Sequence, residues 1–209
     1  MLIFNPRSMT SNNVGKGIAE FVGTFFLTLT IFIAAVNGSA GAFAPLAIGL
    51  TLMVMIYALG HVSGAHFNPA VSIGLFLKGD CSQDELPTYL GAQILAGVLA
   101  FFVGSELVLN GADAAEITAA TFDSTIAVLS AEALWTFALM FVIINVATEQ
   151  AGNQFYGAAI GLTVMAGAFT VGGISLGSFN PAVTAMLTVS GKLAVADIWM
   201  HIVPQLLGA

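Results

Sequence analysis

The chain has 209 residues, of which 58% are hydrophobic and only 7% are charged, and its net charge is −7. A soluble domain carries about 25% charged residues, so this composition excludes an ordinary soluble protein, whose surface must be polar. The only cations are Arg7, Lys16, Lys78 and Lys192, too few for a nucleic-acid-binding patch, and the single cysteine excludes an intrachain disulfide or a cysteine metal cluster.

Beyond a polar segment that ends at Lys16, the chain contains a series of long apolar runs. A helix needs about 20 apolar residues to cross the hydrocarbon core of a membrane. We predict such a helix in each of the runs 18–36, 42–60, 86–108, 125–147 and 154–173. No charged segment leads into a short apolar core with a cleavage site, so we expect the first span to direct the chain to the membrane.

Two shorter apolar runs, 69–77 and 181–189, each begin with Asn-Pro-Ala. The two tripeptides are Asn68, Pro69 and Ala70, and Asn180, Pro181 and Ala182. As a helix, each run rises only about 14 Å, which is about half of a 30 Å hydrocarbon core. Because proline suits the first position of a helix, we predict two re-entrant half-helices with the asparagines as N-caps.

A sixth apolar run begins near Asp197 and stops at Ala209. A helix from Ile198 to Ala209 would be about 18 Å long, too short to cross a membrane. We therefore expect the sixth transmembrane helix to be truncated in this sequence, with roughly ten or more further residues in the native protein.

The second half of the chain repeats the first at a constant offset of 112 positions. The identical pairs include Glu20 and Glu132, Thr24 and Thr136, Gly49 and Gly161, Asn68 and Asn180, and Gln93 and Gln205. The two repeats, about 18–108 and 125–209, contain three spans each, and an odd number of spans forces them to insert in opposite orientations. We therefore predict an all-α membrane protein with six transmembrane helices and two half-helices in an inverted repeat.

In an inverted repeat the two half-helices enter from opposite sides, and their first residues can meet near the membrane centre. The side-chain oxygen of an N-cap asparagine accepts a helix N–H, which leaves the amide NH₂ of Asn68 and of Asn180 free to donate into a cavity. Each helix N-terminus also carries about half a positive charge. Such a site favours the oxygen of a neutral molecule and excludes protons and cations.

The segment GHVSGAHFNPAVS at 60–72, the second Asn-Pro-Ala and the repeat resemble the major intrinsic protein family, the aquaporins and aquaglyceroporins. The resemblance covers about 18–209. It implies that 1–209 is one aquaporin-like channel domain, a passive pore for water and small neutral solutes rather than an enzyme. It also implies a homotetramer in the cell membrane, surrounded by lipid, with no catalytic residues, no cofactor and no nucleic-acid partner.

Two carboxylates, Glu20 and Glu132, lie early in the first and fourth spans, where a charge is costly and suggests a function. They could relay protons or ions, or they could accept hydrogen bonds from backbone N–H groups of the re-entrant loops. The repeat and the family resemblance favour the second interpretation. His61 and His66 lack the partners of a metal site, so we expect them to brace the first loop and expect no metal.

The sequence departs from the family three residues after the second asparagine, where Val183 replaces the usual arginine. The resemblance places the rest of the family's selectivity filter at Ile48, Ala168 and Gly177. Water-selective members typically have a bulky aromatic residue, His, a small residue and Arg at these positions, and glycerol channels have Arg followed by Asp, whereas Thr184 follows here. We therefore expect a wider and less polar filter that admits urea, glycerol, ammonia or metalloid hydroxides besides water.

Two other functions remain as alternatives. A secondary transporter also uses inverted repeats and broken helices, but it needs a coupling-ion site, and only the two symmetric glutamates are present. A structural or adhesive protein of the same fold would need adhesive extracellular loops, and the loops here are short and polar. With Arg7, Lys16 and Lys78 inside and Lys192 outside, the positive-inside rule predicts a cytoplasmic N-terminus.

Overall fold

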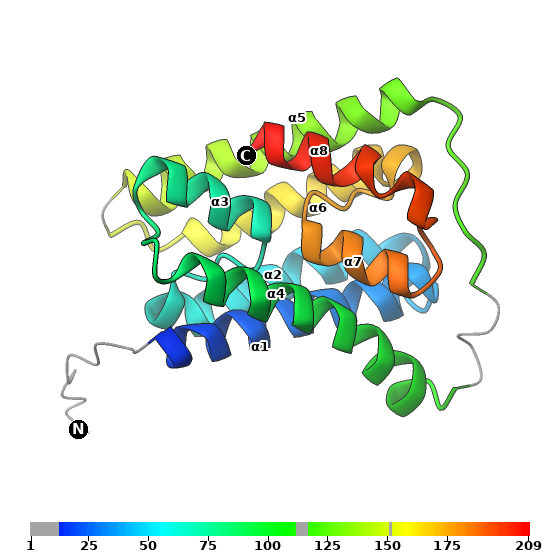
Figure 1. Cartoon of the computed structure of the whole chain (residues 1–209), viewed down its shortest axis with the longest axis horizontal. Coiled ribbons are helices and arrows are strands. Elements are labelled where there is room, and N and C mark those ends of the chain that lie inside the picture. The colour runs from blue at the N-terminus through cyan, green and yellow to red at the C-terminus, as the bar shows by residue number, and fades with distance from the viewer. Residues whose placement is uncertain (1–12, 112–116, 151) are drawn as a thin grey trace.

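The computed structural model describes residues 13–111, 117–150 and 152–209, and these residues form a bundle of helices without strands (Figure 1). The five long helices are α1 (Asn13–Ile31), α2 (Ala44–Ser63), α4 (Leu86–Phe102), α5 (Thr125–Ile143) and α6 (Tyr156–Ser175). With their flanking helical turns they give five segments long and apolar enough to cross a membrane, at Asn13–Val36, Gly41–Ser63, Leu86–Val108, Thr125–Thr148 and Tyr156–Ser175. The five predicted spans are therefore confirmed to within a few residues.

Three short helices complete the bundle: α3 (Pro69–Lys78), α7 (Pro181–Val189) and α8 (Trp199–Gly208). The first two begin at the prolines of the Asn-Pro-Ala tripeptides, as predicted, and lie within the bundle in Figure 1. Helix α8 packs against α5 as α4 packs against α1, so it takes the place of the sixth transmembrane helix. Its ten residues rise only about 15 Å.

Glycines let the helices that surround the half-helices approach closely. Helices α2 and α6 cross at Gly49 and Gly161, where a Cβ on Gly161 would lie 2.5 Å from the carbonyl oxygen of Gly49. A Cβ on Gly97 of α4 would lie 2.4 Å from the carbonyl oxygen of Ala182, in the first turn of α7. Such contacts exclude any larger residue and allow the backbones to pack directly.

Ion pairs at one end of the bundle show that the two repeats run in opposite directions. Lys16, near the start of α1, pairs with Glu85, and this lysine lowers the pKa of Glu85 to about 2. Lys78 pairs with Asp80, in the same loop as Glu85, and with Glu149, which follows the last turn of the α5 segment. The start of α1 and the end of its counterpart α5 therefore share one end of the molecule.

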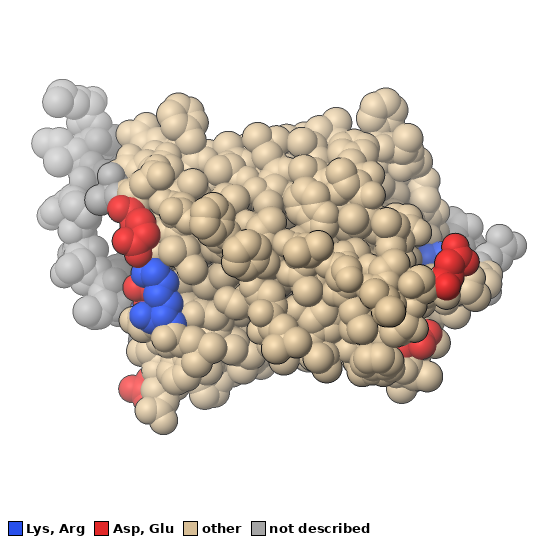
Figure 2. Space-filling view, turned by 90° about the horizontal axis from the view of Figure 1, so that it is seen from above, with Lys and Arg blue, Asp and Glu red and all other residues tan. Residues whose placement is uncertain are grey.

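The surface between the two ends is apolar. Figure 2 shows charged residues only at the left and right ends of the face in view, with an uncharged band between them. Large hydrophobic side chains are exposed on the long helices, among them Phe26, Leu50, Leu95, Phe137 and Leu162. A face that is apolar towards the outside fits lipid as solvent, so the chain spans a membrane. Arg7, one of the predicted cytoplasmic cations, lies outside the described residues.

Candidate functional site

The two Asn-Pro-Ala tripeptides form matching helix N-caps. Asn68 and Asn180 have extended backbones, with φ of −155° and −157°, and each is followed by a proline at the first helical position. The Oδ1 of each asparagine accepts a hydrogen bond at 2.9 Å from the backbone N–H two residues later. Each cap satisfies one of the donors that a helix start leaves unpaired.

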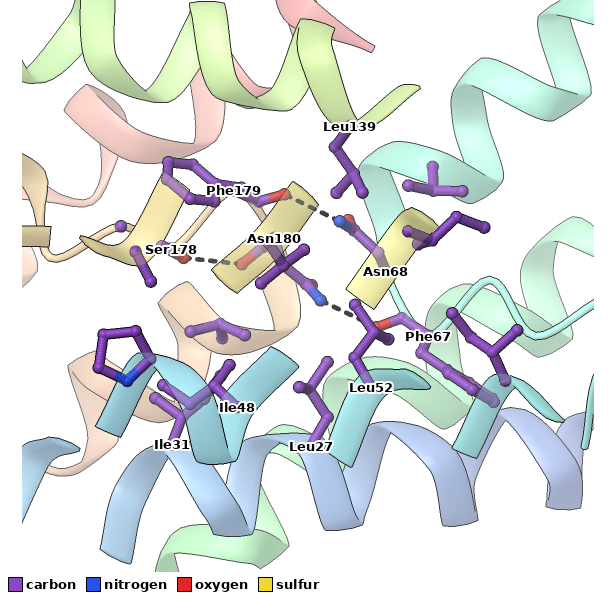
Figure 3. A pocket seen from close by; sticks show the side chains of 18 of the residues that line it. Leu27, Ile31, Ile48, Leu52, Phe67, Asn68, Leu139, Ser178, Phe179 and Asn180 are labelled. Atoms are coloured by element: carbon purple, nitrogen blue, oxygen red, sulfur yellow. Dashed lines mark hydrogen bonds between the residues drawn. The ribbon is translucent and has the colours of Figure 1, made fainter. Parts of the chain in front are cut away.

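The two caps are also bonded to each other's loops (Figure 3). Asn68 Nδ2 donates to the carbonyl oxygen of Phe179 at 2.8 Å, and Asn180 Nδ2 donates to that of Phe67 at 2.9 Å. The N-termini of α3 and α7 therefore meet inside the bundle. The prediction of a free amide group is wrong for one hydrogen of each NH₂, because this exchange uses it, while the second hydrogen stays available as a donor.

Glu20 holds the first re-entrant loop by hydrogen bonds. Its carboxylate is fully buried and accepts hydrogen bonds from Ser63 Oγ at 2.6 Å, Gln93 Nε2 at 2.8 Å, and the backbone N–H groups of His66 at 3.0 Å and Phe67 at 2.7 Å. An ionised carboxylate has about four acceptor positions. All four are therefore occupied, which supports bracing of the loop over a proton relay.

Glu132 repeats this arrangement in the second half. It is fully buried and accepts from Ser175 Oγ at 2.7 Å and Gln205 Nε2 at 2.8 Å. Its two backbone donors are Ser178 at 3.0 Å and Phe179 at 2.8 Å. Each donor lies 112 positions after its counterpart around Glu20, so the repeat seen in the sequence extends to individual hydrogen bonds.

These bonds hold loop residues in a conformation that L-amino acids rarely adopt. Ala65 and Phe67 in the first loop have φ of 53° and 50°, and Leu176 and Phe179 in the second have φ of 67° and 49°. Left-handed backbone at residues with a side chain is strained and persists only where the surroundings enforce it. Both loops, 64–67 and 176–179, line the central cavity, where their carbonyl groups can serve as acceptors.

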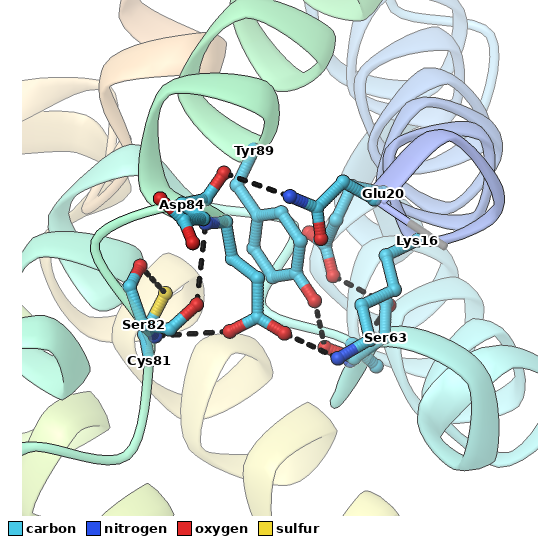
Figure 4. A network of polar contacts seen from close by, with 10 residues as sticks. Lys16, Glu20, Ser63, Cys81, Ser82, Asp84 and Tyr89 are labelled. Carbon is cyan, nitrogen blue, oxygen red and sulfur yellow. Dashed lines mark hydrogen bonds and ion pairs between the residues drawn. The ribbon is translucent and has the colours of Figure 1, made fainter. Parts of the chain in front are cut away.

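The loops have further polar supports, and two of these were not predicted. The hydroxyl of Tyr89 donates to the carbonyl of Ser63 at 2.6 Å, and His201 Nε2 lies 2.7 Å from the carbonyl of Ser175 (Figure 4 shows the Tyr89 contact). Tyr89 and His201 are counterparts at an offset of 112, but a search for identical residues misses them because their types differ. His66 Nδ1 lies 3.1 Å from Ser72 Oγ, close enough to support the loop.

His61 does not support the loop, and this prediction is wrong. Its side chain is exposed on the last turn of α2 and forms no hydrogen bond with residues 64–67, all of which the structure describes. Among the described residues no group of three His, Cys, Asp or Glu side chains could hold a metal ion.

A cavity of about 320 Å³ runs along the two loops. Its wall includes Pro45 in the first turn of α2 and Tyr156 at the start of α6, which lie at opposite ends because the repeats are inverted. The wall is mostly apolar, and Figure 3 shows Leu27, Ile31, Ile48 and Leu52 facing the crossed asparagines. All four residues of the predicted filter line it, namely Ile48, Ala168, Gly177 and Val183.

Comparison with known proteins agrees with this geometry. A sequence model described as Major intrinsic protein matches residues 7–166 and 146–209. The chain is 36% identical to the putative aquaporin NIP4-1 of Arabidopsis thaliana over 92% of its own length and 70% of that protein, and 36% identical to the aquaporin NIP1-1 of Zea mays over 94% and 71%. Its fold is similar to the X-ray structure of the aquaglyceroporin from Plasmodium falciparum, with a TM-score of 0.77, 24% identity, and coverage of 94% of this chain and 92% of that one.

Proposed function

The chain belongs to the major intrinsic protein family, and from that premise we propose that its central cavity is a passive pore for small neutral solutes as well as water. Members of the family are channels and not enzymes, so the chain is a membrane channel for water or small solutes. The proposal adds which part of the molecule conducts and which solutes it admits.

The observation that carries the proposal is the position of Asn68 and Asn180 on the cavity wall, where their half-helices meet. Each amide keeps one N–H that can donate to a solute oxygen, and each helix start adds about half a positive charge. A neutral solute is therefore held by donors at the centre, whereas a cation meets a positive potential there.

The apolar side chains of the predicted filter favour passage of solutes larger than water. Ile48, Ala168, Gly177 and Val183 offer no side-chain hydrogen bond and no charge. A constriction of this kind does not distinguish water from a small organic molecule by polar contacts, so the width of the cavity decides what passes. Urea, glycerol, ammonia and metalloid hydroxides are the solute classes that we propose.

The polar groups in the membrane argue against the alternative of a secondary transporter. Each buried carboxylate accepts four hydrogen bonds, two of them from loop N–H groups, so neither is available to hold a coupling ion. We further propose that the protein forms a homotetramer in the cell membrane, with the end that carries Lys16 and Lys78 in the cytoplasm, as the positive-inside rule favours.

Stopped-flow measurements on proteoliposomes test the proposed solutes. We first measure water efflux after a hyperosmotic step, and then the uptake of urea, glycerol and ammonia. Each of these four rates should exceed the rate in protein-free vesicles. High water permeability with no solute uptake above that background would contradict the wide filter. Cross-linking and mass measurement in mild detergent test the tetramer.

A further inference from the structure

Lys192 lies at the wall of the cavity. Of the described residues that line it, Lys192 is the only Lys, Arg, Asp or Glu. It follows α7 and shares its end of the cavity with Val36, where the α1 segment ends, and with Pro45, where α2 begins. This is the end opposite to Lys16 and Lys78.

The charge of Lys192 is not compensated by a described carboxylate. Lys16 pairs with Glu85, and Lys78 pairs with Asp80 and Glu149, whereas Lys192 forms no ion pair within the described ranges. Among the described residues, its Nζ contacts only the carbonyl oxygen of Thr118, at a long 3.4 Å. Lys16 and Lys78, which form ion pairs, do not line the cavity, whereas Lys192, which forms none with a described residue, lies at its mouth.

The backbone of Lys192 is held in place more firmly than its side chain. Its carbonyl accepts a hydrogen bond from the N–H of Ala120 at 2.9 Å, and the neighbouring Leu193 is buried and donates to Leu187 of α7 at 2.9 Å. The Cα is thus fixed beside the mouth, and the half-buried side chain has one long contact there, from Nζ to the carbonyl oxygen of Thr118.

A fixed charge at the rim of a narrow apolar cavity acts more strongly than on an open surface, because low-dielectric walls focus its field. The filter residues Ile48, Ala168, Gly177 and Val183 contribute no charge of their own. We propose that Lys192 is a specificity-determining residue of this channel, which excludes cations at the mouth and leaves neutral solutes unaffected. The inference rests on the proposed function, since it requires the cavity to be the pore.

The test compares uptake of methylammonium, a small cation, with uptake of urea in proteoliposomes of the wild type, Lys192→Met and Lys192→Arg. Lys78→Met is the matched control, because it removes a cation that does not line the cavity. The same four proteins are also measured with Asn180→Asp added. This second substitution lowers the central barrier to cations, so that a barrier at the mouth becomes measurable.

Lys192→Met should raise the ratio of methylammonium to urea permeability at least about fivefold in one or both backgrounds. Lys192→Arg and Lys78→Met should each leave the ratio of methylammonium to urea permeability as it is in the protein without that substitution. The increase should shrink between 0.01 M and 1 M salt, as the Debye length falls from about 30 Å to 3 Å.

An unchanged ratio for Lys192→Met in both backgrounds, with urea uptake intact, would overturn this role of Lys192 and leave the proposed pore standing. A wild type that passes neither urea nor water above protein-free vesicles would overturn the proposed pore itself, and the role of Lys192 with it.

Discussion

Glu20 and Glu132 each hold a loop that no regular secondary structure supports. Their place in the sequence could be interpreted in advance, because a carboxylate early in a span, repeated at a fixed offset, needs donors that only a nearby irregular backbone can supply. Their fourth partners, Gln93 and Gln205, could be aligned from the sequence but not assigned a contact. Side-chain hydrogen bonds between distant helices depend on how those helices pack.

Replacing Glu20 by Gln places an amide NH₂ against donors and leaves buried N–H groups of the loop unpaired. We expect the free energy of unfolding to fall by about 2 kcal/mol and urea uptake to fall with it. Thermal unfolding in detergent measures the first effect. Glu149→Gln, at an exposed ion pair, is the control and should change stability by less than about 1 kcal/mol. A Glu20→Gln protein of wild-type stability with altered proton flux would favour a relay instead.

Val183 is buried and lines the cavity. An arginine at this position narrows the cavity and adds fixed donors and a charge. We expect Val183→Arg to reduce urea permeability at least about tenfold and water permeability only a few-fold, because the walls at Ala168 and Gly177 stay small. Paired water and urea fluxes on one vesicle preparation measure this. Equal fractional loss of both would show that position 183 does not filter by size.

At the scale of elements, the half-helices were predictable and their connection was not. The nine-residue runs 69–77 and 181–189, each starting at the proline, predict the start and cap of α3 and α7, and their length to within one residue, from local rules alone. The exchange of hydrogen bonds between the Asn68 and Asn180 amides and the opposite loops joins residues more than 100 positions apart. It depends on the left-handed backbone at Phe67 and Phe179, for which no residue preference gives a signal.

The meeting point of α3 and α7 should respond strongly to charge. Asn180→Asp puts a carboxylate where two helix N-termini converge and removes one cross-loop donor. The anion is favoured there and attracts the cations that the neutral site repels. We expect lower urea uptake together with a cation leak in proteoliposomes, and the same from Asn68→Asp by the symmetry of the site. Unchanged uptake without a leak, in a folded protein, would mean that the caps do not line the pore.

The crossing of α2 and α6 should tolerate no added atom. A Cβ on Gly161 lies 2.5 Å from the carbonyl oxygen of Gly49, so Gly161→Ala must push the helices apart. Overpacking of this kind costs about 1–3 kcal/mol, and we expect a lower melting temperature in detergent. Gly173→Ala, on the same helix with nothing within 4 Å of the added Cβ, is the control and should be neutral or slightly stabilising. Equal behaviour of both variants would argue against the close crossing.

At the scale of the whole molecule, the membrane environment is the reason that the fold could be predicted from the sequence. Hydrocarbon around the protein forces every span to be a long apolar helix, so spans, half-helices and inverted repeat could all be predicted from residue patterns. The role of His61 could not be predicted in this way. Its position three residues before the loop does not show which face of α2 its ring lies on, and the ring is exposed. The apolar band in Figure 2 is the surface that faces lipid, and the cavity inside the bundle has the wall that we propose for solute.

Two adjacent residues on α6, one on the cavity wall and one on the lipid-facing surface, give the most direct test that the cavity is the pore. Ala168 lines the cavity, and Phe169 is 56% exposed on the apolar surface. Urea uptake by proteoliposomes should fall to the level of protein-free vesicles for Ala168→Trp, whose indole fills the constriction, and stay at the wild-type rate for Phe169→Trp. Wild-type urea uptake in the Ala168→Trp protein, at equal protein content per vesicle, would contradict the assignment of this cavity as the pore.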